Sequence, residues 1–351
     1  MCGCCRELFT PHDSASRASP HILRPLARPP YIDVVVHESV HPDALAAELR
    51  EGLAGGEVAT RQHYLSARQA RLWRDIAAAF SPARDDADGA RAYEAVNAVV
   101  AGRAGAGGAH VIGLGCGDGA KERRLLDALS GTGPLTATAV DVSLPLVQVA
   151  VDRLAGAAGT ALGRPVVCDL GLAAADLPAM VGEAPGARVV TLYGILPGME
   201  AFAAMGSALS LLRPGDLLAV SANLLPPGED ELDEVVAQYD NEPTRRWLGA
   251  LLEDAGIEPG AAKVRIGPLS DPGTGACAAV GAWLEPVEAI DLELDGGEVR
   301  LEPGSPVRLL RSARHTPAGL EAIVEAAGLE LLVLEVSPSG EEGVALAVAP
   351  G

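Results

Sequence analysis

The sequence predicts a Rossmann-like α/β fold, in which a mostly parallel sheet of seven strands is covered by helices. Short apolar runs of strand character alternate with helical patterns from residue 109 to residue 221. A glycine-rich turn, Gly115 to Gly119, separates the first of these strands from its helix. A hairpin pattern closes the sequence. Alternation of this kind favours right-handed crossovers, which place ligands at the carboxyl ends of the strands.

The alternating region contains the strands and helices of one nucleotide-binding unit. Strands are expected over 109–112, 135–140, 166–168, 188–192 and 217–221, and helices over 92–100, 121–129, 146–154 and 199–212. The C-terminal segment adds a helix over 317–327 and strands over 329–336 and 344–349, which complete the seven.

The flanking regions have a different pattern. Before the unit we expect a strand over 31–36 and helices over 42–53 and 66–80, and we take Trp73 as an ordinary core aromatic. After Pro226 and Pro227 we expect helices over 230–239 and 247–255 and a hairpin of strands 287–294 and 298–302, turning at Asp295-Gly296-Gly297.

The charge of the chain limits its partners. With 47 acidic and 27 basic residues the net charge is −20, which disfavours binding to nucleic acid or to an anionic membrane. A small cationic or zwitterionic substrate is more compatible with it. No apolar run approaches the roughly twenty residues of a membrane span. Since Arg and Pro interrupt the N-terminal apolar stretches, no secretory signal is expected and a cytoplasmic location follows. Nothing in the sequence indicates an oligomeric state.

Six cysteines do not form a disulfide framework in a chain of 351 residues. Cys2, Cys4 and Cys5 crowd the N-terminus, but a structural zinc site needs a second ligand pair at a suitable distance, and the sequence has none. We predict no metal site and leave the role of this cluster open.

The glycine-rich turn and two acids predict a nucleoside ligand. Gly115 and Gly117 let the backbone approach a ligand closely, and the helix start that follows offers free N–H groups. Asp141 ends the second strand, where an acid holds both ribose hydroxyls, and Asp169 ends the third, within reach of an adenine amino group.

S-adenosylmethionine is the cofactor that fits these residues. The turn lacks the full Gly-x-Gly-x-x-Gly of dinucleotide sites and the Gly-Lys-Ser/Thr of a P-loop, so pyrophosphate is not the expected anion. S-adenosylmethionine carries a ribose, an adenine and only a small carboxylate. The alternative is a sheet whose turns simply require glycine and aspartate.

The sequence resembles the histidine-specific S-adenosylmethionine-dependent methyltransferases of the ergothioneine pathway, as a divergent member. The resemblance is carried by segments 115–121, 140–143, 211–216, 238–241 and 310–316, which follow one another in the family's order. It implies a class I methyltransferase domain with an inserted α+β substrate-binding domain. Gly115 and Gly117 would then shape the cofactor loop, Lys121 would meet the methionine carboxylate, and Asp169 with Leu170 would border the adenine.

The substrate half departs from the family. Ile195 stands where the family has an asparagine, and Leu310 where it has a glutamate that contacts the imidazole. Ser312 and the substrate-holding tyrosine, here Tyr239, are kept. The resemblance therefore implies a methyltransferase whose substrate is not histidine itself.

The expected activity is N-methylation of an amino acid or related small amine, in specialised (natural product) biosynthesis. A neutral amine must attack the methyl carbon, and a tyrosine can orient it or take its proton. Tyr239 is the candidate catalytic residue, and Tyr193, Tyr239, Asp240 and Ser312 are the candidate substrate-binding residues. Two alternatives remain open: a non-catalytic cofactor-binding partner subunit and a small-molecule O-methyltransferase.

The expected organisation has five segments. They are a flexible tail (1–29), the N-terminal part of the substrate domain (30–88), the methyltransferase domain (89–225), the substrate-binding insertion (226–312) and the C-terminal completion of the sheet (313–351).

Overall fold

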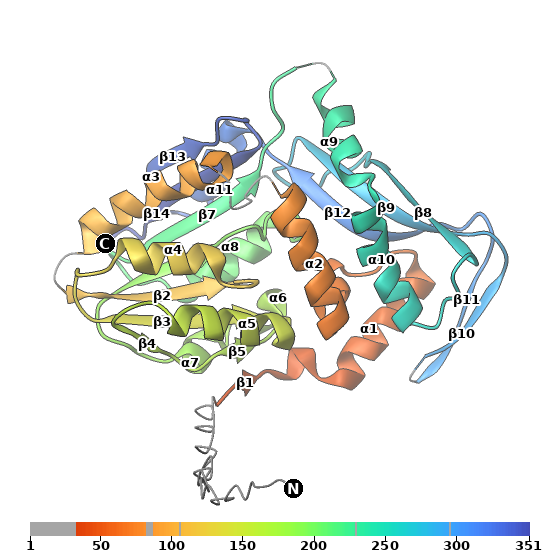
Figure 1. Cartoon of the computed structure of the whole chain (residues 1–351), viewed down its shortest axis with the longest axis horizontal. Helices are drawn as coiled ribbons and strands as arrows, with labels where there is room; N and C mark the ends of the chain where they lie inside the picture. Colours follow the sequence, from red (N-terminus) through yellow and green to blue (C-terminus); the bar gives the residue numbers. More distant parts are fainter. Residues whose placement is uncertain (1–32, 82–86, 105–106, 229, 295) are drawn as a thin grey trace, which may run out of the picture. The chain divides into compact units, whose positions relative to one another are not determined.

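The computed structural model describes residues 33–81, 87–104, 107–228, 230–294 and 296–351 (Figure 1). Residues 33–351 form one compact unit. The predicted flexible tail, the cluster Cys2, Cys4 and Cys5, and the start of the strand predicted over 31–36 lie outside the described residues.

The central sheet has nine strands in the order β1-β5-β3-β2-β6-β7-β14-β13, with β4 paired to β3. Its strands are β1 (Val35–Val36), β2 (Ala109–Leu114), β3 (Leu135–Asp141), β4 (Thr160–Leu162), β5 (Val166–Val167), β6 (Ala187–Leu192), β7 (Leu217–Asn223), β13 (Glu330–Val336) and β14 (Glu342–Val348). All neighbours are parallel except β14, which is antiparallel to both β7 and β13.

This topology confirms the predicted fold class. The seven expected strands are present, and their order along the sheet is third, second, first, fourth, fifth, seventh, sixth, the arrangement of a class I methyltransferase domain. The short strand β1 is part of the strand predicted over 31–36, which was assigned to the substrate domain. The short strand β4 was not predicted. Because β2 reverses the strand order at the centre, its carboxyl end lies at a switch point, where ligands bind.

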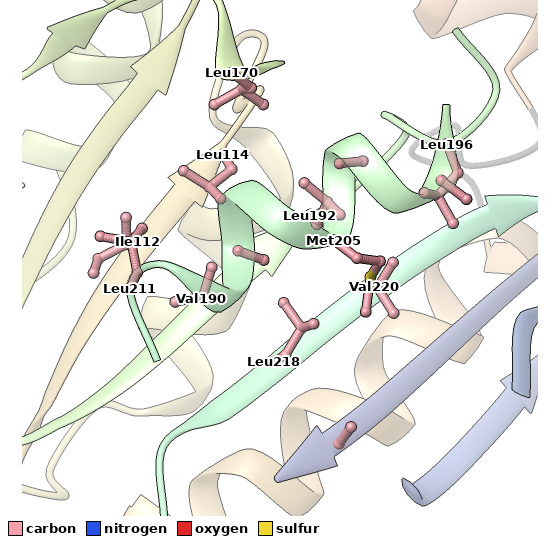
Figure 2. Packing of buried hydrophobic residues seen from close by; sticks show 14 of the residues in the cluster. Ile112, Leu114, Leu170, Val190, Leu192, Leu196, Met205, Leu211, Leu218 and Val220 are labelled. Atoms are coloured by element: carbon pink, nitrogen blue, oxygen red, sulfur yellow. The ribbon is translucent and has the colours of Figure 1, made fainter. Parts of the chain in front are cut away.

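Helices cover both faces of the sheet. One face carries α3 (Ala87–Ala104), α4 (Ala120–Ala128) and α5 (Leu144–Ala155), and the other carries α6 (Leu170–Ala173), α7 (Leu177–Val181), α8 (Ala201–Leu209) and α11 (Pro317–Ala326). Figure 2 shows Met205 of α8 packed over Leu192 and Val220 of the sheet. Strands buried on both faces explain why these segments are apolar throughout rather than alternating.

Local capping explains where several helices begin. Ser66 and Gln69 form a capping box at α2 (Ala67–Phe80), and Ser143 caps α5 through its hydroxyl. Asn241 and Thr316 cap α10 (Glu242–Asp254) and α11, each followed closely by a proline in the first turn. These residue types satisfy the free N–H groups of a first turn, and this makes helix starts visible in a sequence.

A second layer of structure packs around its own core. It consists of a three-stranded antiparallel sheet in the order β12-β9-β8, the predicted hairpin and four helices. The elements not yet given are α1 (Pro42–Gly55), α9 (Glu231–Tyr239), β8 (Ala262–Pro268), β9 (Ala278–Pro286), β10 (Ile290–Leu294), β11 (Gly297–Leu301) and β12 (Val307–Arg314).

This layer joins segments that precede and follow the central-sheet domain in the sequence, since α2 packs on α10 and α1 on β11. The boundary expected between residues 312 and 313 falls inside β12, because that strand pairs with β9 as far as Arg314. Among the described residues, no helix is both long enough and apolar enough to cross a membrane.

Candidate functional site

A cavity of about 1140 Å³ opens at the carboxyl edge of the central sheet. The sheet side contributes the glycine turn and the residues that follow β3, β5, β6 and β7. The opposite wall is formed by α2, α9, the 3₁₀ helix Thr60–Tyr64 and β12. Residues from both layers therefore face one space. Of the predicted site residues the lining includes Gly115, Gly117, Lys121, Asp141, Asp169, Leu170, Tyr193, Tyr239 and Ser312.

The glycine turn leaves no room for larger side chains. Gly115 and Gly117 have φ angles of +61° and +55°. A Cβ at Gly115 would lie 2.0 Å from Cδ1 of Ile195, and one at Gly117 would lie 2.7 Å from Cη2 of Trp73. Both positions therefore require glycine for conformation and for space. Ile195 and Trp73 fill the space beside these two positions, and the turn itself lines the cavity.

Asp141 ends β3 with its carboxylate facing the cavity and 6% of its surface exposed. Its Oδ2 accepts a hydrogen bond from the Gly117 N–H and its Oδ1 one from the Ser143 N–H, both at 2.9 Å. Burial raises the pKa of Asp141 to about 6, while these backbone bonds lower it. Each carboxylate oxygen can accept a further bond, so the side chain is fixed and still able to hold a pair of hydroxyls.

Asp169 is engaged by the protein itself. Its Oδ1 accepts from the Leu172 N–H at 2.8 Å, and its Oδ2 pairs with Arg61, whose guanidinium also pairs with Glu48. Both carboxylate oxygens thus have protein partners. Asp169 lines the cavity, as predicted. Its carboxylate, which we expected near an adenine amino group, instead pairs with Arg61, a residue that the sequence analysis did not consider.

Lys121 lies in the first turn of α4 and lines the cavity. Its Nζ is 5.0 Å from the ring centre of Tyr93 and 5.9 Å from that of Tyr193. Within the described chain, no carboxylate forms an ion pair with it. Lys121 thus lies on two aromatic rings, and Glu122 and Glu342 are close enough to interact with it electrostatically. A cation near a helix start that has no ion pair agrees with a role toward a ligand carboxylate.

Tyr239 and Ser312 meet on the wall opposite the glycine turn. Their hydroxyl oxygens are 2.7 Å apart, and the buried Arg314 donates to the Tyr239 hydroxyl at 3.2 Å. The predicted substrate residue Asp240 is not in this group: it pairs with Arg245 and does not line the cavity.

Tyr193 follows β6, is 5% exposed and belongs to the cavity lining, and its buried hydroxyl has no hydrogen-bond partner in the described part of the chain. Its ring packs edge-on against Tyr93, with ring centres 5.0 Å apart. Burial raises the pKa of Tyr193, as does the nearby Glu122. The phenol is therefore neutral and available as a donor.

Aromatic side chains that the sequence analysis did not assign to the site also line it. Trp73, which we took as a core residue, forms the wall against Gly117, and Tyr64 contacts it edge-on with ring centres 5.8 Å apart. Trp73 is therefore a site residue as well as a packing residue. Its signal in the sequence was weak, because a tryptophan at helical spacing is usually core.

The charge of the cavity differs from that of the chain. Its lining contains eight acidic and eight basic side chains, whereas the chain has 47 and 27. The excess acids lie elsewhere, so the net charge does not by itself select a cationic ligand here. In the residues that the structure describes, no three His, Cys, Asp or Glu side chains group as a metal ion requires.

No protein-family model and no curated protein matches the sequence. Among solved structures, the chain is similar to magnesium protoporphyrin IX methyltransferase from Synechocystis with bound S-adenosylhomocysteine, at 15% identity over 82% of this chain and 97% of that chain, with a TM-score of 0.43. It is also similar to a sugar N-methyltransferase from Streptoalloteichus, at 14% identity over 78% and 92% of the two chains, with a TM-score of 0.38. The fold assignment accordingly depends on the strand order described above.

Proposed function

We propose that the chain is an S-adenosylmethionine-dependent N-methyltransferase that acts on an amino acid or related small amine other than histidine. The observation that carries this proposal is the presence of two halves in one cavity. Gly115, Gly117 and Asp141 lie on the sheet side, and Tyr239 with Ser312 lies on the facing wall.

The residues of the sheet side fit the cofactor. Gly115 and Gly117 let the turn line the cavity while packing against Ile195 and Trp73, and Asp141 offers two fixed carboxylate oxygens to a ribose. Lys121 would take the methionine carboxylate, and Leu170 would border the adenine. When bound, the cofactor supplies a methyl group on a sulfonium, which reacts with a lone pair held in line with it in a dry site.

The acceptor end of the cavity, formed by the facing wall and the segment after β6, supports an acceptor different from histidine. Leu310 and Ile195 both line the cavity, so the positions that are polar in the resembling family are apolar here. An imidazole placed against them would lose its hydrogen bonds to water without replacement, at a cost of roughly 1–3 kcal/mol for each unsatisfied group. Tyr239, Ser312 and Tyr193 supply the polar contacts instead.

Calorimetric titration with S-adenosylhomocysteine tests the cofactor half, and a methyl-transfer screen over amino acids and amines, including histidine and arginine, tests the acceptor half. Micromolar binding with turnover of an amine other than histidine supports the proposal. Binding without turnover of any acceptor favours the non-catalytic alternative, turnover of an alcohol favours the O-methyltransferase, and absence of binding rejects the cofactor.

A further inference from the structure

Glu342 is a buried carboxylate in the cavity to which the proposed function gives no role. It is the first residue of β14, is 1% exposed and belongs to the cavity lining. β14 is antiparallel to β7, and Glu342 is paired with Asn223, the last residue of β7. The start of an antiparallel strand thus lies at the carboxyl edge of the parallel ones, and this brings an acid from the end of the chain to the site.

One oxygen of this carboxylate is hydrogen bonded, and the other has no partner among the described residues. The Tyr93 hydroxyl hydrogen bonds to Oε1 of Glu342 and lies 2.9 Å from Oγ of Ser221. Ser221 in turn accepts from the Gly194 N–H at 3.1 Å. Oε2 is buried and has no hydrogen-bond partner among the described residues. A buried acceptor left open in a cavity costs free energy unless a ligand satisfies it.

The charged and titratable groups around Glu342 come from three elements: Tyr93 from α3, Lys121 from α4 and Arg314 from β12. Burial raises the pKa of Glu342 most, whereas Lys121, the neighbouring hydroxyls of Tyr93 and Ser221, and Arg314 lower it. Neither cation forms an ion pair with Glu342 in the described structure. A buried carboxylate without a close counter-ion favours a cationic partner and accepts a proton readily.

We propose that Oε2 of Glu342 binds the ammonium group of the methyl acceptor and takes its proton. This inference rests on the proposed function and identifies the acceptor as an amine that is protonated in solution. The N–H bond breaks as the O–H bond forms, which leaves a carboxylic acid and a neutral amine. The freed lone pair then forms the new N–C bond while the S–C bond of the sulfonium breaks.

The cofactor's own α-ammonium has the same chemistry and is the competing source of the cation. Glu342 lies between the two halves of the cavity: Tyr93, which holds it, also contacts Lys121, whereas Arg314 near it donates to Tyr239 on the facing wall. We take the acceptor as the source of the cation. If Glu342 binds the acceptor, removing its carboxylate weakens binding of the amine. If it binds the cofactor's ammonium, the same change weakens binding of S-adenosylhomocysteine, so both affinities are measured.

The experiment compares wild type, Glu342→Gln, Glu342→Asp and the control Glu330→Gln, an exposed acid that begins the neighbouring strand β13. Each protein is titrated with S-adenosylhomocysteine, and the loaded protein is then titrated with arginine, lysine, putrescine, n-butylamine and the uncharged 1-butanol. Turnover of the same probes with S-adenosylmethionine is measured from pH 6.5 to pH 9.5, and circular dichroism checks the fold.

We expect Glu342→Gln to bind S-adenosylhomocysteine within threefold of wild type and to lose roughly 100-fold in kcat/KM for an amine at neutral pH. The loss should shrink toward pH 9.5, because solution then supplies more neutral amine. Glu342→Asp should retain more activity than Glu342→Gln, and Glu330→Gln should match wild type.

Three results overturn the assignment while leaving the cofactor site intact. The first is unchanged amine kinetics in a folded Glu342→Gln protein. The second is a loss of S-adenosylhomocysteine affinity in that variant as large as its loss toward the amine. The third is a wild type that binds S-adenosylhomocysteine but neither binds nor methylates any of the amines. Failure of the wild type to bind S-adenosylhomocysteine rejects the proposed function and this inference with it.

Discussion

The hydroxyl oxygens of Tyr239 and Ser312 lie 2.7 Å apart, so a residue from α9 and one from β12 meet on the acceptor wall. We expect Tyr239→Phe to lower kcat/KM for the acceptor about tenfold, since the half-buried hydroxyl that contacts both Ser312 and Arg314 is lost. Binding of S-adenosylhomocysteine should change less than threefold. Steady-state kinetics and calorimetry measure the two effects, and unchanged acceptor parameters would show that Tyr239 is structural.

Asp141→Ala should weaken binding of S-adenosylhomocysteine by at least roughly tenfold, because two hydrogen bonds to a charged acceptor are lost. Calorimetric titration measures the affinity, with Glu330→Gln as the control for an acid outside the cavity. An affinity equal to that of wild type would reject the ribose assignment.

The pKa of Asp141, raised by burial to about 6, predicts how cofactor affinity depends on pH. Ligand hydroxyls donate to the ionised carboxylate, so affinity should be constant above pH 7 and fall as the pH decreases through 6. Below that value the weakening should approach tenfold per pH unit. Asp141→Asn should bind weakly and lose this dependence. A wild-type profile that is flat from pH 5 to pH 8 would contradict the proposed contact.

Gly117→Ala tests the close contact of the glycine turn with α2. The new Cβ would lie 2.7 Å from Trp73 and the residue would keep a φ of +55°, so we expect at least a tenfold loss of cofactor affinity. Adding Trp73→Ala should restore part of that loss by removing the clash, while the backbone strain of about 1–2 kcal/mol remains.

Gly131→Ala is the matched control for that substitution, because its φ is +87° and nothing lies within 4 Å of the added Cβ. It should show strain alone, as a lower melting temperature with unchanged affinity. If Gly117→Ala binds like Gly131→Ala, the turn does not approach the ligand.

His63 predicts a loss of stability in acid. Its Nε2–H donates to the Leu309 carbonyl at 2.9 Å, and burial lowers its pKa to about 4 from 6.5. The unfolded chain takes up a proton below pH 6.5 that the folded protein resists until about pH 4. The stability is therefore present above pH 6.5 and lost as the pH falls, by about 3 kcal/mol from this group. Urea titrations of wild type and His63→Gln at several pH values measure the free energy of unfolding. If it falls equally steeply with decreasing pH in both proteins, the assignment is contradicted.

Much of the fold was predictable because its signals are local. The strands of the central sheet are continuous apolar runs, and Ser143 and Thr316 cap the helices that follow them. The hairpin β10–β11 turns at residues 294–297, within the predicted Asp-Gly-Gly turn. In contrast, the sequence does not predict β8 and β9. The small residues of β9, such as Ala279 and Gly281, show no alternation, and this strand depends on pairing with β12.

The residues themselves predict the site where topology brings them together, whereas Tyr239 and Ser312, which also line the cavity, were indicated only by the family resemblance. Gly115, Gly117 and Asp141 follow adjacent parallel strands, so they share one edge. Arg61 and Trp73 reach that edge through contacts between layers, which no local pattern encodes. Glu342 had a usable signal: an acid at the entry of the last strand of a predicted terminal hairpin lies at the ligand edge when that strand is antiparallel to its neighbour.

β14 lies between β7 and β13 in the sheet although it follows both in the sequence, so this part of the sheet is completed late in synthesis. A nascent chain that has emerged as far as Asn223 already contains the glycine turn and Asp141, yet the outer edge of β7 is still unpaired. Such an edge offers its backbone to other chains until it is covered. Because β14 covers that edge and carries Glu342, a molecule in which β14 has not docked both exposes the edge of β7 and lacks Glu342 at the cavity.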